Sequence, residues 1–267
     1  VGDPLQVEPV VTIPKVLIDI LGDNTGVEND YKSIENSAQT FADNINEFNG
    51  MIGNRQVGCP LVVHRRCIDP MFSISNLISY DNRMFNKTNM KEEYQKPENP
   101  FLIKKSGWIH VEGDENGNRD HFVKNQAVKV GELLEEAVHI YSDLFETDDK
   151  IFIITPFRTV AESMREFIVS YFSKKGYDKK VLSKWTKNCV GTVHTFQGKD
   201  ANEVIFVLGC SDKSVGAMNW VVKKANILNV ACTRAKYRIA FIGNLNDWKN
   251  RRYFREFIPK FIDTIDV

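Results

Sequence analysis

Short runs of apolar residues alternate with amphipathic stretches along most of this chain. An apolar run of about four to eight residues is typical of a buried strand, whereas apolar residues three or four positions apart indicate a helix. The predicted strands are 61–63, 108–111, 151–154, 190–194, 204–208 and 239–242, and the predicted helices are 31–49, 70–80, 122–145, 160–172 and 228–236. Strands separated by helices predict an α/β fold, a doubly wound and mainly parallel sheet with helices on both faces.

Polar stretches mark the loops between these elements. Residues 50–58 contain several glycines and predict a loop. Residues 81–105 are rich in Asn, Lys and Glu, which favours a surface insertion. The opening, 1–9, lacks a starting methionine and has the Gly and Pro of a tight turn. We therefore expect a fragment that begins just after a strand.

Composition narrows the class of protein. The chain is 42% hydrophobic and 26% charged, which is globular composition, and its formal net charge of 0 requires no polyanionic partner. Its five cysteines are scattered without a CxxC pair, which argues against a disulfide framework or zinc ribbon. Apolar runs stay below the ~18 residues of a membrane span. We expect a cytoplasmic protein without membrane contact.

Polar segments at strand ends are the candidates for chemistry, because ligands of open parallel sheets bind there. The first, 64–67, places Arg65 and Arg66 directly after a predicted strand. Guanidinium groups bind phosphate oxygens with two parallel hydrogen bonds. Adjacent arginines are also common on solvated, salt-bridged surfaces, so both interpretations stay open.

The second segment, 191–200, is a polar loop that follows a predicted strand. Its hydroxyl groups, the Gln197 amide and the backbone at Gly198 suit an anion, and Asp200 suits sugar hydroxyls. An ordinary turn between a strand and the next element has a similar composition. This loop alone does not decide between the two.

The third segment, 228–236, has helical character and presents Arg234 and Lys236 before the last predicted strand. An arginine that projects toward a shared cleft can stabilise charge on a phosphoryl group during transfer, which is the arginine-finger role. The alternative is a cation favoured by the dipole at a helix C-terminus.

Five short stretches, taken in order, resemble successive motifs of superfamily 1 helicases, most closely the branch of the nonsense-mediated-decay and replication-associated helicases. They are GDPLQ (2–6), HRRC (64–67), IITPF (153–157), TVHTFQGKD (192–200) and NVACTRAK (229–236). The resemblance runs to about Asn244, and its most specific elements are 196–198 and 229–236. It implies a RecA-like fold, in which 1–57 is the end of a first motor domain with a connecting segment and 58–267 is the second motor domain.

The resemblance also implies a ligand for each motif. ATP with Mg²⁺ is the implied cofactor, bound mainly by the first motor domain. Gln6 matches the glutamine that couples the γ-phosphate to the nucleic-acid site, and Arg66 and Arg234 match the phosphate-sensing arginine and the arginine finger. Arg65 stands where the family has a tyrosine stacked on adenine, and a guanidinium can also stack on a base.

The remaining motif residues are implied to contact the nucleotide or a single strand of DNA or RNA. Gln197 and Gly198 would approach the γ-phosphate, and Asp200 replaces the usual glutamate near ribose or phosphate. The implied contacts to the nucleic-acid backbone, which position a strand without reading its sequence, are Thr155, Pro156, Thr192 and His194.

Two expected motor components are missing from the sequence. No G-x-x-x-x-G-K-[ST] phosphate loop occurs, because Gly198-Lys199 is followed by Asp200, and Asp114-Glu115 lies in a polar turn. Without them, Mg²⁺ and the triphosphate have no cradle and the attacking water has no carboxylate. We therefore expect that the chain alone neither hydrolyses ATP nor unwinds, and that it needs the first motor domain as a partner.

Other functions make different demands on the sequence. A degenerate RecA-like module that only binds nucleic acid or protein needs no γ-phosphate sensor, so the combination of Arg66, Gln197 and Arg234 disfavours it. A nuclease needs clustered metal ligands, and the five histidines are dispersed, so no metal ligand is predicted. Trp220, close to Lys223 and Lys224, could stack on a base, with core packing as the alternative.

Overall fold

The computed structural model describes residues 5, 13–28, 32, 38–52, 55–88, 100–117 and 120–265. The chain separates into two compact units, Val1–Val62 and Val63–Val267. The assignment of the first part to another motor domain stays a prediction. Gln6 lies outside the described residues.

The first unit contains α1 (Lys15–Asn24), α2 (Ala38–Asn44) and an antiparallel pair of strands, β1 (Gly50–Ile52) and β2 (Arg55–Val57). Two predictions were wrong here. The helix predicted over 31–49 ends at Asn44, and the predicted loop 50–58 contains the strand pair. The helix ends because the Asn46 side chain accepts a hydrogen bond from the Phe48 N–H at 2.9 Å. Such a local turn competes with helical hydrogen bonding.

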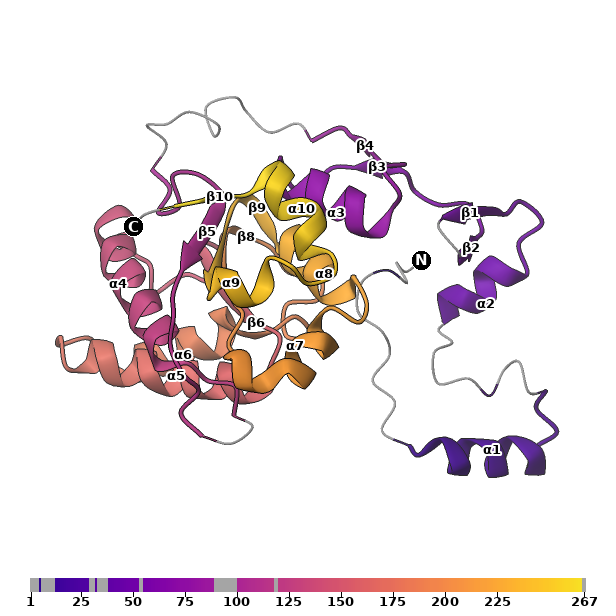
Figure 1. Cartoon of the computed structure of the whole chain (residues 1–267), viewed down its shortest axis with the longest axis horizontal. Helices are drawn as coiled ribbons and strands as arrows, with labels where there is room; N and C mark the ends of the chain where they lie inside the picture. The colour runs from indigo at the N-terminus through magenta and orange to yellow at the C-terminus, as the bar shows by residue number, and fades with distance from the viewer. Residues whose placement is uncertain are drawn as a thin grey trace. The chain divides into compact units, whose positions relative to one another are not determined.

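The centre of the second unit is a six-stranded parallel sheet with the strand order β10-β5-β9-β8-β6-β7 (Figure 1). Its strands are β5 (Gly107–His110), β6 (Ile151–Thr155), β7 (Val190–Thr192), β8 (Ala201–Val207), β9 (Ala235–Gly243) and β10 (Asp263–Thr264). All of β6 and nearly all of β8 are buried, as expected of strands covered on both faces. The predicted doubly wound, RecA-like α/β fold is confirmed.

Helices form a layer on each face of this sheet (Figure 1). One layer contains α4 (Lys124–Ile140), α5 (Arg158–Ser173) and α6 (Lys179–Cys189), and the other contains α3 (Met71–Ser79), α8 (Asn226–Arg234) and α10 (Phe254–Phe261). The shorter elements are η3 (Asp212–Ser214), α7 (Val215–Val221) and α9 (Leu245–Trp248). We did not predict α6, although Asp178 caps it by accepting hydrogen bonds from the N–H groups of Lys180 and Val181 at 2.8 and 2.9 Å.

The strand predicted over 61–63 does not enter the central sheet. Only β3 (Val63–His64) forms there, it pairs with β4 (Phe85–Asn86), and Leu61 is 80% exposed. The edge beside β5 is occupied by β10, which we did not predict. Of the apolar run, Val63 alone enters a strand, and that strand belongs to a separate two-stranded sheet.

The last part of the predicted surface insertion, 81–105, does not lie on the surface. Its residues Phe101, Leu102 and Ile103 are buried. The cause is Glu203, a fully buried residue of β8. Its carboxylate accepts hydrogen bonds from the N–H groups of Leu102 and Ile103 at 3.0 and 2.6 Å and from the Tyr141 hydroxyl at 2.7 Å. Burial raises the pKa of Glu203, and these three donors oppose that rise. One carboxylate thus fixes an otherwise irregular segment against the sheet.

All five cysteines are unpaired, and four of them are buried. In the described part of the chain, no helix is long and apolar enough to cross a membrane.

Glu203→Gln should lower the free energy of unfolding by about 2 kcal/mol or more. The amide group turns an N–H toward a donor that the carboxylate had accepted, which leaves buried polar groups unpaired. Urea denaturation measures the loss, with Glu146→Gln on the exposed surface as the control. An equal and small effect of both substitutions would show that the carboxylate does not anchor residues 101–103.

Candidate functional site

A buried side-chain amide joins α8, which carries Arg234, to α3, the helix that follows the Arg65-Arg66 loop. Asn229 of α8 accepts a hydrogen bond from the Ser75 hydroxyl at 2.5 Å and donates one to the Tyr80 hydroxyl at 3.1 Å. Ser75 belongs to α3, which directly follows the Arg65-Arg66 loop, and Arg234 is the last residue of α8. The amide therefore sets the position of one candidate segment relative to another.

Backbone contacts hold the Arg65-Arg66 loop at the start of β9. The N–H of Ile68 donates to the carbonyl of Lys236 at 3.1 Å. The His64 ring accepts from the N–H of Cys67 at 2.9 Å, and the Thr88 hydroxyl donates to the Cys67 carbonyl at 3.0 Å. The predicted helix over 228–236 ends two residues early, so Lys236 is extended and can make the first of these bonds.

Arg234 is fully buried and points toward the second candidate segment. Its Nη1 donates to the carbonyls of Phe196 and Lys199 at 3.2 and 2.9 Å, and its Nη2 donates to the Thr233 hydroxyl at 3.3 Å. Gly198 turns the chain between those carbonyls with a φ of +81°, a conformation that suits glycine. In this structure the Arg234 guanidinium therefore binds the loop 196–199, and its role as an arginine finger stays a prediction.

The charges at this site are unbalanced. Burial and, to a smaller extent, the positive charge of Arg66 lower the pKa of Arg234 to about 10, and Asp200 opposes the change. Asp200 also forms an ion pair with Lys236 at 2.7 Å. The Nε of Arg234 is buried without a hydrogen-bond partner among the described residues. Two neighbouring guanidiniums and Lys236, with Asp200 already paired to the lysine, produce a positive potential suited to an anion with several charges.

The remaining residues of the predicted nucleotide site reach the surface. Arg65, Gln197 and Gly198 are exposed, whereas Arg66 and Asp200 are half-buried. Phe196 anchors the loop, because its buried ring stacks on Phe152 with 4.3 Å between centroids. The structure thus brings all three candidate segments together.

The four predicted nucleic-acid contacts divide into buried and accessible pairs. Thr155 and Thr192 are Cα partners at the carboxyl ends of β6 and β7, so the structure places them side by side. Thr155 is 1% exposed, its hydroxyl accepts a hydrogen bond from the N–H of Phe157 at 3.4 Å, and Pro156 is also buried. The direct contact predicted for Thr155 and Pro156 is thus blocked in this conformation, whereas His194 is exposed and Thr192 half-buried.

Folding also brings together three side chains of types that can bind a metal ion, although two of them lie far from the third in the sequence. Ligand atoms of Glu115, His121 and Cys210 lie within 4.8 Å of one another. The Glu115 carboxylate accepts hydrogen bonds from the Ser211 N–H at 2.8 Å and the Ser214 hydroxyl at 3.0 Å. Burial favours a higher pKa for Glu115, but these donors outweigh it and the pKa lies below its ordinary value. Hydrogen bonding to the loop after β8 accounts for the position of the carboxylate.

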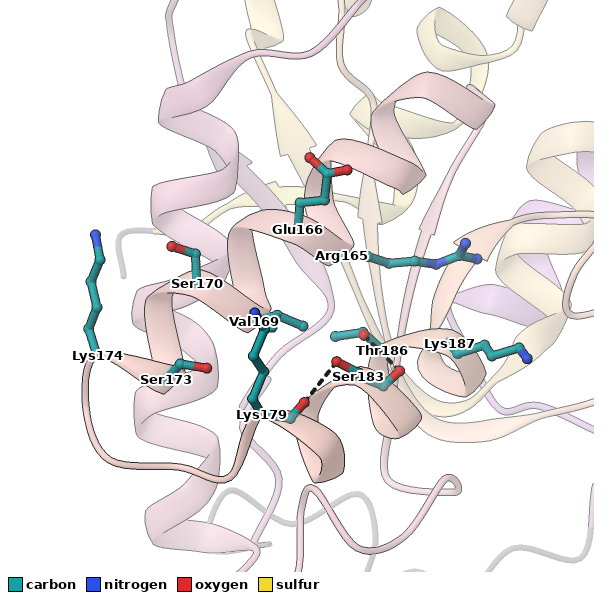
Figure 2. Close-up of a pocket in the computed structure, with 10 residues that line it drawn as sticks. All are labelled: Arg165, Glu166, Val169, Ser170, Ser173, Lys174, Lys179, Ser183, Thr186 and Lys187. Carbon is teal, nitrogen blue, oxygen red and sulfur yellow. Dashed lines mark hydrogen bonds between the residues drawn. The ribbon is translucent and has the colours of Figure 1, made fainter.

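A separate basic groove of about 840 Å³ lies between α5 and α6 (Figure 2). Its charged lining is mostly cationic, from Arg165, Lys174, Lys179 and Lys187, with Glu166 as the anion. The Arg165 side chain is fixed by a hydrogen bond from its Nε to the Val190 carbonyl at 2.8 Å. None of the sequence-predicted site residues lines this groove.

Comparison with known proteins identifies the family. A family model described as an AAA domain matches residues 47–246, a span that includes all three candidate segments. The chain belongs to this AAA-domain family. The helicase motifs in the sequence therefore lie within a domain that the family match recognises as a whole.

Two of the three relatives that match this chain are named as helicases. "Probable helicase senataxin" of Mus musculus is 24% identical over 263 residues, 97% of this chain. "ATP-dependent helicase upf1" of Schizosaccharomyces pombe is 34% identical over 96 residues, and "Regulator of nonsense transcripts 1 homolog" of Arabidopsis thaliana is 33% identical over 97 residues, each covering 36% of this chain. The chain spans 9%, 10% and 7% of the lengths of these three proteins. The predicted superfamily 1 helicase-like branch is confirmed.

Ser75→Ala should lower the free energy of unfolding by roughly 1–3 kcal/mol, because it leaves the buried Asn229 oxygen without its donor. Ser79→Ala is the matched control on the same helix, since the Ser79 hydroxyl is buried without a partner in the described structure. That control should change stability by less than about 0.5 kcal/mol. Both are measured from urea unfolding curves. Equal losses would mean that the Ser75 hydrogen bond does not hold α3 against α8.

Proposed function

We propose that this domain is the second motor domain of an ATP-dependent helicase, and that Arg66 and Arg234 act on the phosphates of ATP held mainly by a first motor domain. The observation that supports this most is that the Arg234 guanidinium binds the loop that carries Gln197, and that Arg66 lies close enough for its charge to lower the pKa of Arg234. The repulsion between the two positive charges is unfavourable until a bound anion neutralises them. The negatively charged triphosphate of ATP is such an anion.

The donor groups at the site suit the phosphates of a nucleotide. The buried Nε of Arg234 has no hydrogen-bond partner in the described structure. Arg65 and Gln197 belong to the segments on either side of the site, and their exposed side chains can reach a ligand from solvent. ATP with its Mg²⁺ supplies the phosphoryl group for hydrolysis, and the metal arrives with the nucleotide. The role of this domain is to bind and neutralise charge on the phosphates.

A change in the contacts of Arg234 is part of the proposal. Its guanidinium now binds two neutral carbonyls, of Phe196 and Lys199. A phosphate oxygen is a stronger acceptor for a guanidinium than a neutral carbonyl, because it carries negative charge and a phosphate can accept two parallel N–H bonds. We infer that closure of the two motor domains around ATP exchanges carbonyl contacts of Arg234 for phosphate contacts.

Single-stranded DNA or RNA is the second proposed ligand. His194 and Thr192 lie at the carboxyl edge of the sheet, in the segment whose other end binds Arg234. A strand bound there would contact the same loop as the nucleotide. Movement of that loop would connect hydrolysis to translocation.

The alternative proposal is a RecA-like binding module without motor activity, and one observation favours it. The hydrogen bonds of Arg234 to Phe196, Lys199 and Thr233 are all internal, so the residue could serve only to brace the loop 196–199. A structural brace and an arginine finger differ in how a substitution changes the kcat of ATP hydrolysis. The Arg234→Lys experiment below separates the two roles.

The 267-residue chain alone should show no ATP hydrolysis above background, because the phosphate cradle and the catalytic carboxylate are absent from its sequence. Phosphate release with and without single-stranded nucleic acid measures this. Turnover that Arg234→Ala abolishes would refute the dependence on a first motor domain.

In the longer protein that contains both motor domains, Arg234→Lys should lower the kcat of ATP hydrolysis about a thousandfold while nucleotide affinity changes little. Lysine keeps the charge but loses the planar fork that binds a phosphoryl group in transfer. Steady-state kinetics and equilibrium binding of a fluorescent nucleotide give the two quantities.

Arg255→Ala, on the exposed surface of α10, is the control for the Arg234 experiment. Unchanged kcat in Arg234→Lys together with a lower unfolding midpoint would make Arg234 a structural brace of the loop 196–199 and would refute the arginine-finger role. Weaker nucleotide binding with normal kcat would instead assign Arg234 to ground-state recognition.

A further inference from the structure

Trp220 differs from the other tryptophans of the chain in its exposure. It is 51% exposed, whereas Trp108, Trp185 and Trp248 are at most 3% exposed. The short helix α7 buries Met218 and Val221 and leaves the indole on its outer side. An exposed indole offers a flat aromatic face on which a ligand can stack.

The exposed indole is supported by aromatic residues from two other segments. The ring centroid of Trp220 lies 5.8 Å from that of Phe157, and the Phe157 ring lies 4.6 Å from the His121 ring. Phe157 is nearly buried and follows Pro156 at the carboxyl end of β6. The loop that carries His121 is tied to α5, because the Thr159 hydroxyl donates to the carbonyl of Asp120 at 2.7 Å. The indole therefore rests on a fixed base.

Basic groups adjoin this aromatic surface in the chain. Arg158 directly follows Phe157, its side chain is 87% exposed, and it forms an ion pair with Glu162 at 2.8 Å. Lys223, three residues after Trp220, is also exposed. An open aromatic face with nearby cations is the arrangement that binds single-stranded nucleic acid, where bases stack on rings and cations contact phosphates.

We propose that Trp220 is a stacking platform for one base of a single strand, with Arg158 and Lys223 available to the adjoining phosphates. This inference rests on the proposed function and extends its nucleic-acid track from Thr192 and His194 past β6 to α7. Stacking uses the face that all bases share, so the contact would be independent of sequence. Because Thr155 and Pro156 are buried, their motif would act by positioning Phe157 beneath the indole.

The test uses the 267-residue chain and its own fluorescence, because Trp220 is the single tryptophan that solvent reaches. Titration with oligo(U) or oligo(dT) should quench the emission and protect the remaining signal from acrylamide. Trp220→Phe should remove the acrylamide-accessible component. Fluorescence anisotropy of a labelled oligonucleotide then gives affinities for the variants.

Trp220→Ala should weaken oligonucleotide binding about tenfold, and Trp220→Phe should retain most of the affinity because phenylalanine can still stack. Phe85→Ala, which removes a ring that is 63% exposed on β4, is the control and should leave affinity unchanged. Circular dichroism melts of each variant check folding. The recovery by phenylalanine distinguishes stacking from general destabilisation.

Three results would overturn the inference. Binding by the unsubstituted chain with no change in Trp220 emission and full affinity in Trp220→Ala would exclude stacking and leave the proposed function intact. A Trp220→Ala variant that loses self-association in sedimentation, with oligonucleotide affinity unchanged, would assign the surface to a protein contact. No oligonucleotide binding by the unsubstituted chain would refute both the platform and the proposed track.

Discussion

Asn229 occupies the interior between α8 and α3 and uses its carbonyl and its amide group at once, toward Ser75 and Tyr80. A buried amide is costly without partners, so the two helices are stable together only when both hydrogen bonds are made. Arg66 precedes one helix and Arg234 ends the other. The distance between the two candidate catalytic charges thus depends on an uncharged group in the core, which tolerates little displacement.

That arrangement explains how like charges can be kept close. Burial and the charge of Arg66 both lower the pKa of Arg234, yet a value of about 10 leaves its guanidinium protonated at neutral pH. The repulsion is offset by packing elsewhere in the domain rather than by a complete set of counter-ions, because Asp200 is also paired with Lys236. A site built in this way is poised to bind an anion.

The sequence predicts the central sheet well because its strands are apolar on both faces, and runs such as 151–154 and 204–208 fit no other environment. It fails where burial is decided by a distant residue. The sequence around residues 101–103 does not indicate that the Glu203 carboxylate fixes them. The sequence of 61–63 does not indicate that Val63 pairs with β4 outside the central sheet. The missed helix α6 is different, since its Asp178 cap was visible in the sequence.

The same reasoning applies to the candidate site. The order of its motifs predicts that the segments carrying Arg66, Gln197 and Arg234 meet, but residue types do not say which way a side chain points. Arg234 turns inward because the carbonyls around Gly198 face it, a property of backbone geometry. Thr155 is buried because the hydroxyl serves the turn that begins α5. Asn229 belongs to a motif that the sequence shows, but its partners Ser75 and Tyr80 could be identified only from the folded structure.

The position of β5 has a consequence for the order in which the domain can form. Both of its neighbours in the sheet, β9 and β10, come much later in the chain. During synthesis the edges of β5 remain unpaired while the helices of one layer are already made, and open strand edges are where chains associate wrongly. The final pairing also brings the Trp108 ring against Phe241 and Phe254. The sheet around β5 can therefore be completed only late in synthesis, after β9 and β10 have been made.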